Sequence, residues 1–154
     1  MNVALVTPEL YSLVRRSNLA SVTESLAHAL IAVGNQVKVF IPRSAEMDSD
    51  SLLRAVEVGK VTIEDPEDGP VEFTLLETRV KDLPVVIFDQ PKYFNDRNPY
   101  GNDAGPYPDN WLRYALFSRA VLEAMQVLKF TPRVIHCMDW STGLIPVIHD
   151  VEYR

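Results

Sequence analysis

The sequence has 154 residues, of which 47% are hydrophobic, and a formal net charge of −6. That length and composition are typical of one soluble globular domain with a packed core, and the absence of a basic run disfavours nucleic acid or an anionic membrane as a partner. The single cysteine, Cys137, excludes an internal disulfide and favours a reducing, cytoplasmic setting, and neither a signal peptide nor a bilayer-spanning apolar run of roughly 20 residues is seen.

The amino-terminal part predicts a strand, a helix and a second strand. Residues 2–7 form a short apolar run typical of a buried strand, and residues 36–42 form another. Between them, apolar residues recur at helical spacing: Leu19, Val22, Leu26, Ala29, Leu30 and Val33. Ser17 or Asn18 is expected to cap this helix, and Gly34 to end it. The three elements predict a parallel, right-handed βαβ unit.

The middle of the sequence changes to strand-like alternation. Residues 55–64, 71–80 and 83–89 are three such runs, separated by turn-forming residues. The first two predict a partly solvated antiparallel ribbon, whereas the third is apolar over most of its length and predicts a return to the central sheet. The polar stretch over residues 45–54 predicts a loop or a short helix.

Two further helices and one strand are predicted in the carboxyl-terminal part. Residues 90–108 have the composition of a loop, after which Asp109 is expected to cap a helix over residues 110–129. This helix carries two apolar rows, formed by Leu112, Leu116, Ala120 and Ala124 and by Phe117, Val121 and Met125. Residues 133–138 then predict a buried strand, and an apolar helix starts shortly before Arg154. We therefore expect the domain to be truncated at its carboxyl end.

This order of elements predicts an α/β fold. We expect an open, twisted, mostly parallel Rossmann-like sheet with an antiparallel ribbon insertion, formed by a single domain over residues 1–154. Ligands of such sheets bind outside the carboxyl ends of the parallel strands. Residues 8–18, 89–108 and 139–143 occupy that edge, so we expect any functional site there.

Several kinds of chemistry are missing from the sequence. The six glycines form neither a Gly-x-Gly-x-x-Gly turn nor a phosphate-binding P-loop, and no Gly-x-Ser-x-Gly elbow is present. The three histidines are scattered, and a single cysteine cannot build a structural zinc site. We therefore expect no dinucleotide, no metal and no other cofactor.

The edge segments together resemble one family, the bacterial-type glycogen synthases and plant starch synthases. The resemblance rests on "TPEL" ahead of the first helix, on "NPYGNDAGPYPDNWLRYALFSRAVLE" and on "PRVIHCMDWSTGLIPV", and it covers nearly the whole chain. It implies the amino-terminal, acceptor-binding part of a two-domain GT-B glycosyltransferase, whose carboxyl-terminal domain supplies most of the nucleotide-sugar site. The implied reaction transfers glucose from ADP-glucose or UDP-glucose to an α-1,4-glucan, with retention and without a metal. This chain alone is expected to be inactive.

The first loop departs from the motif of that family, which reads Lys-x-Gly-Gly-Leu with an aspartate two residues after the leucine. The matching positions here are Arg15, Ser17, Asn18, Leu19 and Ser21. The family's glycines let the backbone approach the donor diphosphate closely, so we expect the donor site of this chain to be degraded. Arg15 and Arg16 are either phosphate contacts, for which guanidinium groups are suited, or solvated loop charges.

The remaining candidate residues also come from the resemblance. The family's Asp-Trp-His turn reads Asp139, Trp140 and Ser141, and serine is too short to replace a histidine that contacts the donor glucose. Capping and packing of the next helix is the alternative role of the first two. Glu9 matches a glutamate on the family's active-site side or else serves as a helix-dipole partner or a surface carboxylate. The tyrosines of residues 90–108 either stack on sugar rings or order their own loop. No residue is assigned a catalytic role. The implied substrate-binding set is Glu9, Arg15, Arg16, Tyr93, Tyr100, Asn102, Asp139 and Trp140.

Three hypotheses about function follow. The first is the acceptor-side part of a starch or glycogen synthase-like glucosyltransferase, with an α-glucan acceptor and a nucleotide-sugar donor as partners. The second is a non-catalytic module of the same fold that binds glucan or a partner protein. The third is a related transferase with a different donor. The oligomeric state stays open.

Overall fold

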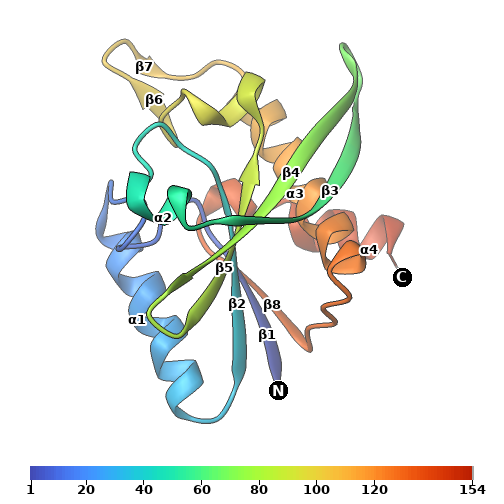
Figure 1. Ribbon diagram of the computed structural model, residues 1–154. Helices are drawn as coiled ribbons and strands as arrows, with labels where there is room; N and C mark the ends of the chain where they lie inside the picture. The colour runs from blue at the N-terminus through green and yellow to red at the C-terminus, as the bar shows by residue number, and fades with distance from the viewer. Residues whose placement is uncertain (154) are drawn as a thin grey trace.

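The computed structural model describes residues 1–153 and contains a six-stranded sheet with helices on both of its faces (Figure 1). The strands, in spatial order, are β3 (Val56–Asp65), β4 (Gly69–Val80), β5 (Leu83–Asp89), β2 (Gln36–Pro42), β1 (Asn2–Val6) and β8 (Val134–Cys137). The helices are α1 (Asn18–Ala32), α2 (Ser49–Leu53), α3 (Asn110–Val127) and α4 (Ile145–Glu152). A separate small hairpin consists of β6 (Gly101–Asn102) and β7 (Gly105–Pro106). The expectation about Arg154 lies outside the described residues.

The predicted parallel core and antiparallel ribbon are both present. β1 pairs in parallel with β2 and with β8, and β2 pairs in parallel with β5. β5 also pairs antiparallel with β4, and β4 with β3. The third strand-like run therefore joins the ribbon to the central sheet, as predicted. The α/β class is confirmed, and α2 realises the short-helix alternative for residues 45–54.

Alternate residues of the parallel strands enter two separate hydrophobic clusters. One cluster contains Val3, Leu5, Val37, Val39 and Ile41 together with Ala27 of α1. The other contains Ala4, Val6, Phe40 and Phe88 together with Phe117 of α3. Because both faces are covered, these strands have continuous apolar sequences rather than alternating ones. The two apolar rows predicted for α3 are buried throughout.

The buried face of α1 differs from the predicted one. Its buried residues are Ala20, Thr23, Glu24 and Ala27. Val22 and Val33, which belong to the predicted row, are 56% and 75% exposed. Glu24 is buried because its carboxylate accepts hydrogen bonds from the backbone N–H and the hydroxyl of Ser12. A polar residue with a hydrogen-bond partner inside the protein is thus buried where hydrophobicity alone predicts an apolar residue.

The predicted starts of α1 and α3 are both correct, but only the first helix is capped by a side chain. The Ser17 hydroxyl accepts a hydrogen bond from the N–H of Leu19, and Gly34 ends α1 with a φ of 88°. Asp109 occupies the N-cap position of α3, as predicted, but its side chain makes no capping hydrogen bond. Its carboxylate instead accepts hydrogen bonds of 2.6 and 2.7 Å from both terminal nitrogens of Arg97.

The segment over residues 90–108 is more ordered than a simple loop. Pro91–Asn95 form a single π-helical turn, capped by the Gln90 side chain, and the β6–β7 hairpin follows. Gly101 is required in this hairpin, since a Cβ at that position would lie 2.2 Å from the carbonyl oxygen of Gly105. The short strands escape prediction because neither contains an apolar run.

The strand predicted over residues 133–138 is correct in position but not buried. Among the described residues β8 pairs with β1 alone and forms one edge of the sheet. Val134 is 43% exposed, and His136 is also exposed. A short apolar run does not indicate whether a strand has neighbours on both sides, so the sequence could not distinguish a central strand from this one.

Candidate functional site

The three segments predicted to share the carboxyl edge of the sheet are in contact. The hydroxyl of Tyr100 donates a hydrogen bond of 2.6 Å to Glu9, which joins the second segment to the first. The ring of Tyr100 lies 6.2 Å from that of Trp140, which joins the second segment to the third. Helix-to-sheet packing and parallel strand order therefore bring together residues from distant parts of the sequence.

A fourth segment at this edge, residues 43–48, is missing from the prediction. The N–H of Ala45 donates to the carbonyl of Arg97, and the N–H of Asp48 donates to the carbonyl of Leu13, each at 3.0 Å. The signal was available, because a strand predicted as parallel must deliver its following segment to the same edge as its neighbours.

Glu9 is completely buried and holds the first loop in shape. One carboxylate oxygen accepts hydrogen bonds from the backbone N–H groups of Arg16 and Ser17, at 3.1 and 2.9 Å. The Ser17 hydroxyl lies within 3.0 and 3.2 Å of the two carboxylate oxygens. Glu9 is thus neither a surface carboxylate nor a group that faces solvent at this edge.

The two residues that replace the family's glycines fit the backbone without strain. Ser17 has a φ of −146°, and neither it nor Asn18 has a positive φ. The backbone at these two positions therefore does not need glycine to adopt its conformation. The side chains of Ser17 and Asn18 instead hinder a ligand from approaching the backbone closely at the start of α1.

The two arginines of the first loop already have partners. Arg16 forms an ion pair of 2.9 Å with Glu46, and the two side chains are 40% and 28% exposed. The guanidinium of Arg15 lies over the ring of Tyr11, 4.7 Å from its centroid. A phosphate at this loop would compete with Glu46 for Arg16, which weakens the phosphate interpretation without removing the charge.

Three aromatic rings form what we call the aromatic platform, namely Tyr100, Tyr114 and Trp140. The Trp140 ring meets that of Tyr114 edge-on at 5.3 Å, yet 56% of Trp140 is exposed. Tyr114 is buried, and its hydroxyl donates to the carbonyl of Pro99 at 2.6 Å. Burial and the hydrogen bond to Glu9 raise the pKa of Tyr100 well above its usual range, so this hydroxyl remains a donor. The platform therefore has a buried base, Tyr114, a half-buried ring, Tyr100, and one large exposed ring, Trp140.

Asp139 and Ser141 flank the exposed tryptophan. Asp139 has a φ of 71°, makes no side-chain capping hydrogen bond and is exposed. It therefore occupies the N-cap position of the 3₁₀ turn over Trp140–Thr142, as its alternative role requires, but it does not cap this turn through its side chain. Ser141 is only 2% exposed, and its hydroxyl has no hydrogen-bond partner within the described residues.

Arg113, which sequence reasoning missed, supports the whole segment over residues 90–108. It is completely buried, and its guanidinium donates hydrogen bonds to the carbonyls of Tyr93, Asn98 and Pro99 at 2.7, 3.2 and 3.2 Å. A fourth bond of 2.7 Å reaches the side chain of Asn110. Burial lowers the pKa of Arg113, but a guanidinium remains charged in proteins. The signal in the sequence was an arginine inside an otherwise apolar helix face.

Tyr93 and Asn102 lie apart from the aromatic platform. Tyr93 is buried, and its hydroxyl contacts the carboxylates of Asp65 and Asp68, which tie it to the end of the ribbon. Asn102 is exposed in the β6–β7 hairpin, where its side chain accepts a hydrogen bond from the N–H of Ala104. The structure thus unites Glu9 with the platform but does not bring these two candidates to it.

The buried phenol of Tyr93 leads to a prediction about alkaline pH. Burial, with the hydrogen bond to Asp65 as the next cause, raises the pKa of Tyr93 from 10.0 to about 12. Its contribution to stability should be complete below pH 10, where both states hold the proton, and should be lost as the pH rises through about 12. Urea unfolding of the wild type and of Tyr93→Phe across this range measures the difference. A loss that is already complete near pH 10 would contradict the prediction.

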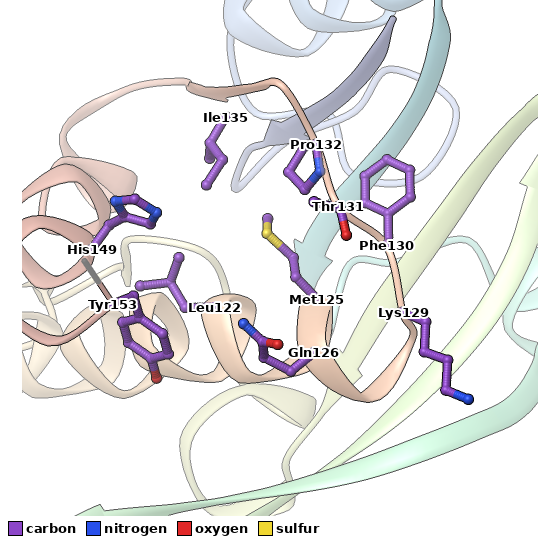
Figure 2. A pocket seen from close by; sticks show the side chains of 10 residues that line it. All are labelled: Leu122, Met125, Gln126, Lys129, Phe130, Thr131, Pro132, Ile135, His149 and Tyr153. Atoms are coloured by element: carbon purple, nitrogen blue, oxygen red, sulfur yellow. The ribbon is translucent and has the colours of Figure 1, made fainter.

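A hollow elsewhere in the molecule contains none of the predicted site residues. It has a volume of about 400 Å³ and lies between α3, residues 129–135 and α4 (Figure 2). Its walls combine apolar side chains, among them Leu122, Met125 and Ile135, with polar ones such as the imidazole of His149. Within residues 1–153, no group of three histidine, cysteine, aspartate or glutamate side chains is placed to hold a metal ion. In the same part of the chain, no helix is long and apolar enough to cross a membrane.

Comparisons with known proteins agree with this architecture. Residues 2–154 match the family model described as the starch synthase catalytic domain. A glycogen synthase from Geotalea uraniireducens is 34% identical over 96% of this chain, and glycogen synthase 2 from Geobacter sulfurreducens is 34% identical over 99%. The catalytic domain of starch synthase IV from Arabidopsis thaliana, bound to ADP and acarbose, matches 99% of the chain with a TM-score of 0.79 and 25% identity. The chain spans only 30% to 31% of the length of these three proteins.

Proposed function

Because this chain belongs to the starch synthase catalytic domain family, we propose that it is the acceptor-side part of a glucosyltransferase. The proposed reaction extends an α-1,4-glucan with glucose from ADP-glucose or UDP-glucose. The role of the described residues is to bind the glucan at the aromatic platform. Residues outside this chain would hold most of the donor, so the chain alone should bind glucan without transferring glucose.

The observation that carries this proposal is the exposed face of the aromatic platform. Trp140 and Tyr100 come from separate segments and lie side by side at the carboxyl edge of the sheet, where ligands of such folds bind. An indole and a phenol offer apolar surface together with polar groups, which suits a sugar ring with its apolar C–H face. The match to a starch synthase structure bound to ADP and acarbose supports the choice of ligand classes.

Titration of the chain with maltoheptaose tests the proposal. We expect saturable binding by calorimetry, accompanied by a change in tryptophan fluorescence. Cellohexaose, in which the glucose units have β linkages, is the control and should bind far more weakly. Absence of maltoheptaose binding, or equal binding of both saccharides, would contradict the proposal. Transfer of glucose from ADP-glucose by this chain alone would contradict the division of roles.

A second candidate function, a non-catalytic glucan-binding or partner-binding module, is favoured by the state of the first loop. The backbone N–H groups of Arg16 and Ser17 donate hydrogen bonds to Glu9, and the Arg16 side chain forms an ion pair with Glu46. The loop as folded therefore offers little to a donor diphosphate. The replacement of several motif residues at once points in the same direction.

Restoring the family's motif residues separates the two candidates. The restored variant carries Arg15→Lys, Ser17→Gly, Asn18→Gly, Ser21→Asp and Ser141→His. For a non-catalytic module, we expect glucose transfer by the complete gene product to stay unchanged. The buried position of Ser141 leaves little room for an imidazole, so a second variant without that substitution is needed. Gain of transfer by either variant would show an enzyme with a decayed donor site.

A further inference from the structure

The hydrogen bonds of Glu9 connect two segments of the site. One of its carboxylate oxygens takes the Tyr100 hydroxyl at 2.6 Å, and the other takes the backbone N–H groups of Arg16 and Ser17. The Ser17 hydroxyl contacts both oxygens. Among residues 1–153 no ion pair includes Glu9, so this buried carboxylate is stabilised by hydrogen bonds. Its donors come from the entry to α1 and from the aromatic platform.

We propose that Glu9 is a positioning residue that couples the aromatic platform to the entry of α1. It acts through Tyr100 and does not touch the substrate. A displacement of the Tyr100 hydroxyl alters its hydrogen bond to one Glu9 oxygen. The carboxylate then shifts, and this alters the hydrogen bonds that the Arg16 and Ser17 N–H groups donate to the other oxygen. The coupling to glucan rests on the proposed function, whereas the link between Tyr100 and the first loop exists without a ligand.

Two features make the link specific. Both carboxylate oxygens are engaged and the side chain is completely buried, so water cannot replace a lost donor without a local rearrangement. Ser17 also joins the link to helix formation, because its hydroxyl contacts Glu9 and caps α1 at the N–H of Leu19. A family glycine at this position would lack both contacts.

The ligand experiment follows the backbone N–H resonances of Arg16 and Ser17 by NMR while maltoheptaose is added. In the wild type we expect both resonances to shift with the binding curve. Tyr100→Phe removes the hydroxyl that donates to Glu9, so the two N–H responses should be lost at maltoheptaose concentrations that saturate this variant. Tyr11→Phe is the matched control, since Tyr11 is an exposed tyrosine of the first loop, and it should keep the responses. Responses that survive in Tyr100→Phe would overturn the proposal.

The ligand-free experiment is a double-mutant cycle on urea unfolding with Glu9→Gln and Tyr100→Phe. We expect the double variant to have an unfolding equilibrium constant roughly tenfold smaller than independent effects predict, because Glu9→Gln removes the charge that strengthens the shared hydrogen bond and Tyr100→Phe removes the bond itself. An additive cycle overturns the proposal even if maltoheptaose binds. Absence of maltoheptaose binding instead contradicts the proposed function and leaves the cycle to decide the link. If Glu9→Gln does not fold, the rate of hydrogen exchange at the Arg16 and Ser17 N–H groups of Tyr100→Phe is measured instead. We expect faster exchange than in the wild type, and unchanged exchange would contradict the proposed link.

Discussion

Replacing Arg113 with methionine should lower the free energy of unfolding by about 3–5 kcal/mol. Methionine approximates the volume of the arginine side chain but cannot donate hydrogen bonds. The carbonyls of Tyr93 and Asn98 would lose the guanidinium as a partner, whereas that of Pro99 keeps the hydroxyl of Tyr114. Each buried carbonyl left unsatisfied costs roughly 1–3 kcal/mol. The segment that presents Tyr100 should then lose its fixed conformation. Urea unfolding measures the loss, and maltoheptaose binding should weaken in parallel.

Two further variants show whether the hydrogen bonds of Arg113 are responsible. Arg119→Met removes an arginine of the same helix that forms an ion pair with Glu152; the two side chains are 41% and 35% exposed. This substitution should lower the free energy of unfolding by less than about 1 kcal/mol. Arg113→Lys keeps the charge but lacks the planar fork that reaches several carbonyls, so it should recover only part of the loss. If Arg113→Met proves as mild as Arg119→Met, the supporting role assigned to Arg113 is wrong.

The elements of the fold could be predicted wherever burial is close to uniform. β1, β2 and β5 lie between two layers, so their sequences are mostly apolar runs, and the observed strand ends lie within one residue of the predicted ones. The face of α1 could not be predicted, because Glu24 is buried against a partner that the helical pattern does not reveal. The exposure of β8 depends on what lies beside it, which its own residues do not encode.

The location of the site could be predicted, but the interactions within it could not. Parallel strand order alone placed three segments at one edge, and they are in contact there. Glu9 and Tyr100 are 91 residues apart, and no local pattern announces their hydrogen bond. The same holds for Arg16 and Glu46, whose pairing turns a candidate phosphate ligand into one side of an internal ion pair. Which charged and polar side chains pair with one another is decided by the folded chain.

Replacing Trp140 with alanine should weaken the binding of maltoheptaose by roughly 30-fold, which corresponds to about 2 kcal/mol. The indole is the largest exposed part of the aromatic platform, and its removal leaves mainly Tyr100 to contact a sugar. The loss of stability should be smaller, about 0.5–1.5 kcal/mol, because the substitution mainly removes the edge-on packing of the indole against Tyr114. Calorimetric titration and urea unfolding measure the two effects separately.

The other tryptophan of the chain provides the matched control. Trp111 is 65% exposed on α3 and takes no part in the aromatic platform, so Trp111→Ala should leave the affinity for maltoheptaose unchanged. Trp140→Phe should retain part of the affinity, since a smaller ring still offers an apolar face. Equal losses in Trp140→Ala and Trp111→Ala would mean that exposed aromatic area, and not the platform, governs binding. A loss of affinity in Trp140→Ala alone would mean that binding needs a ring in a fixed position. The Trp140 ring is positioned by its contact with Tyr114 and by the 3₁₀ turn over Trp140–Thr142.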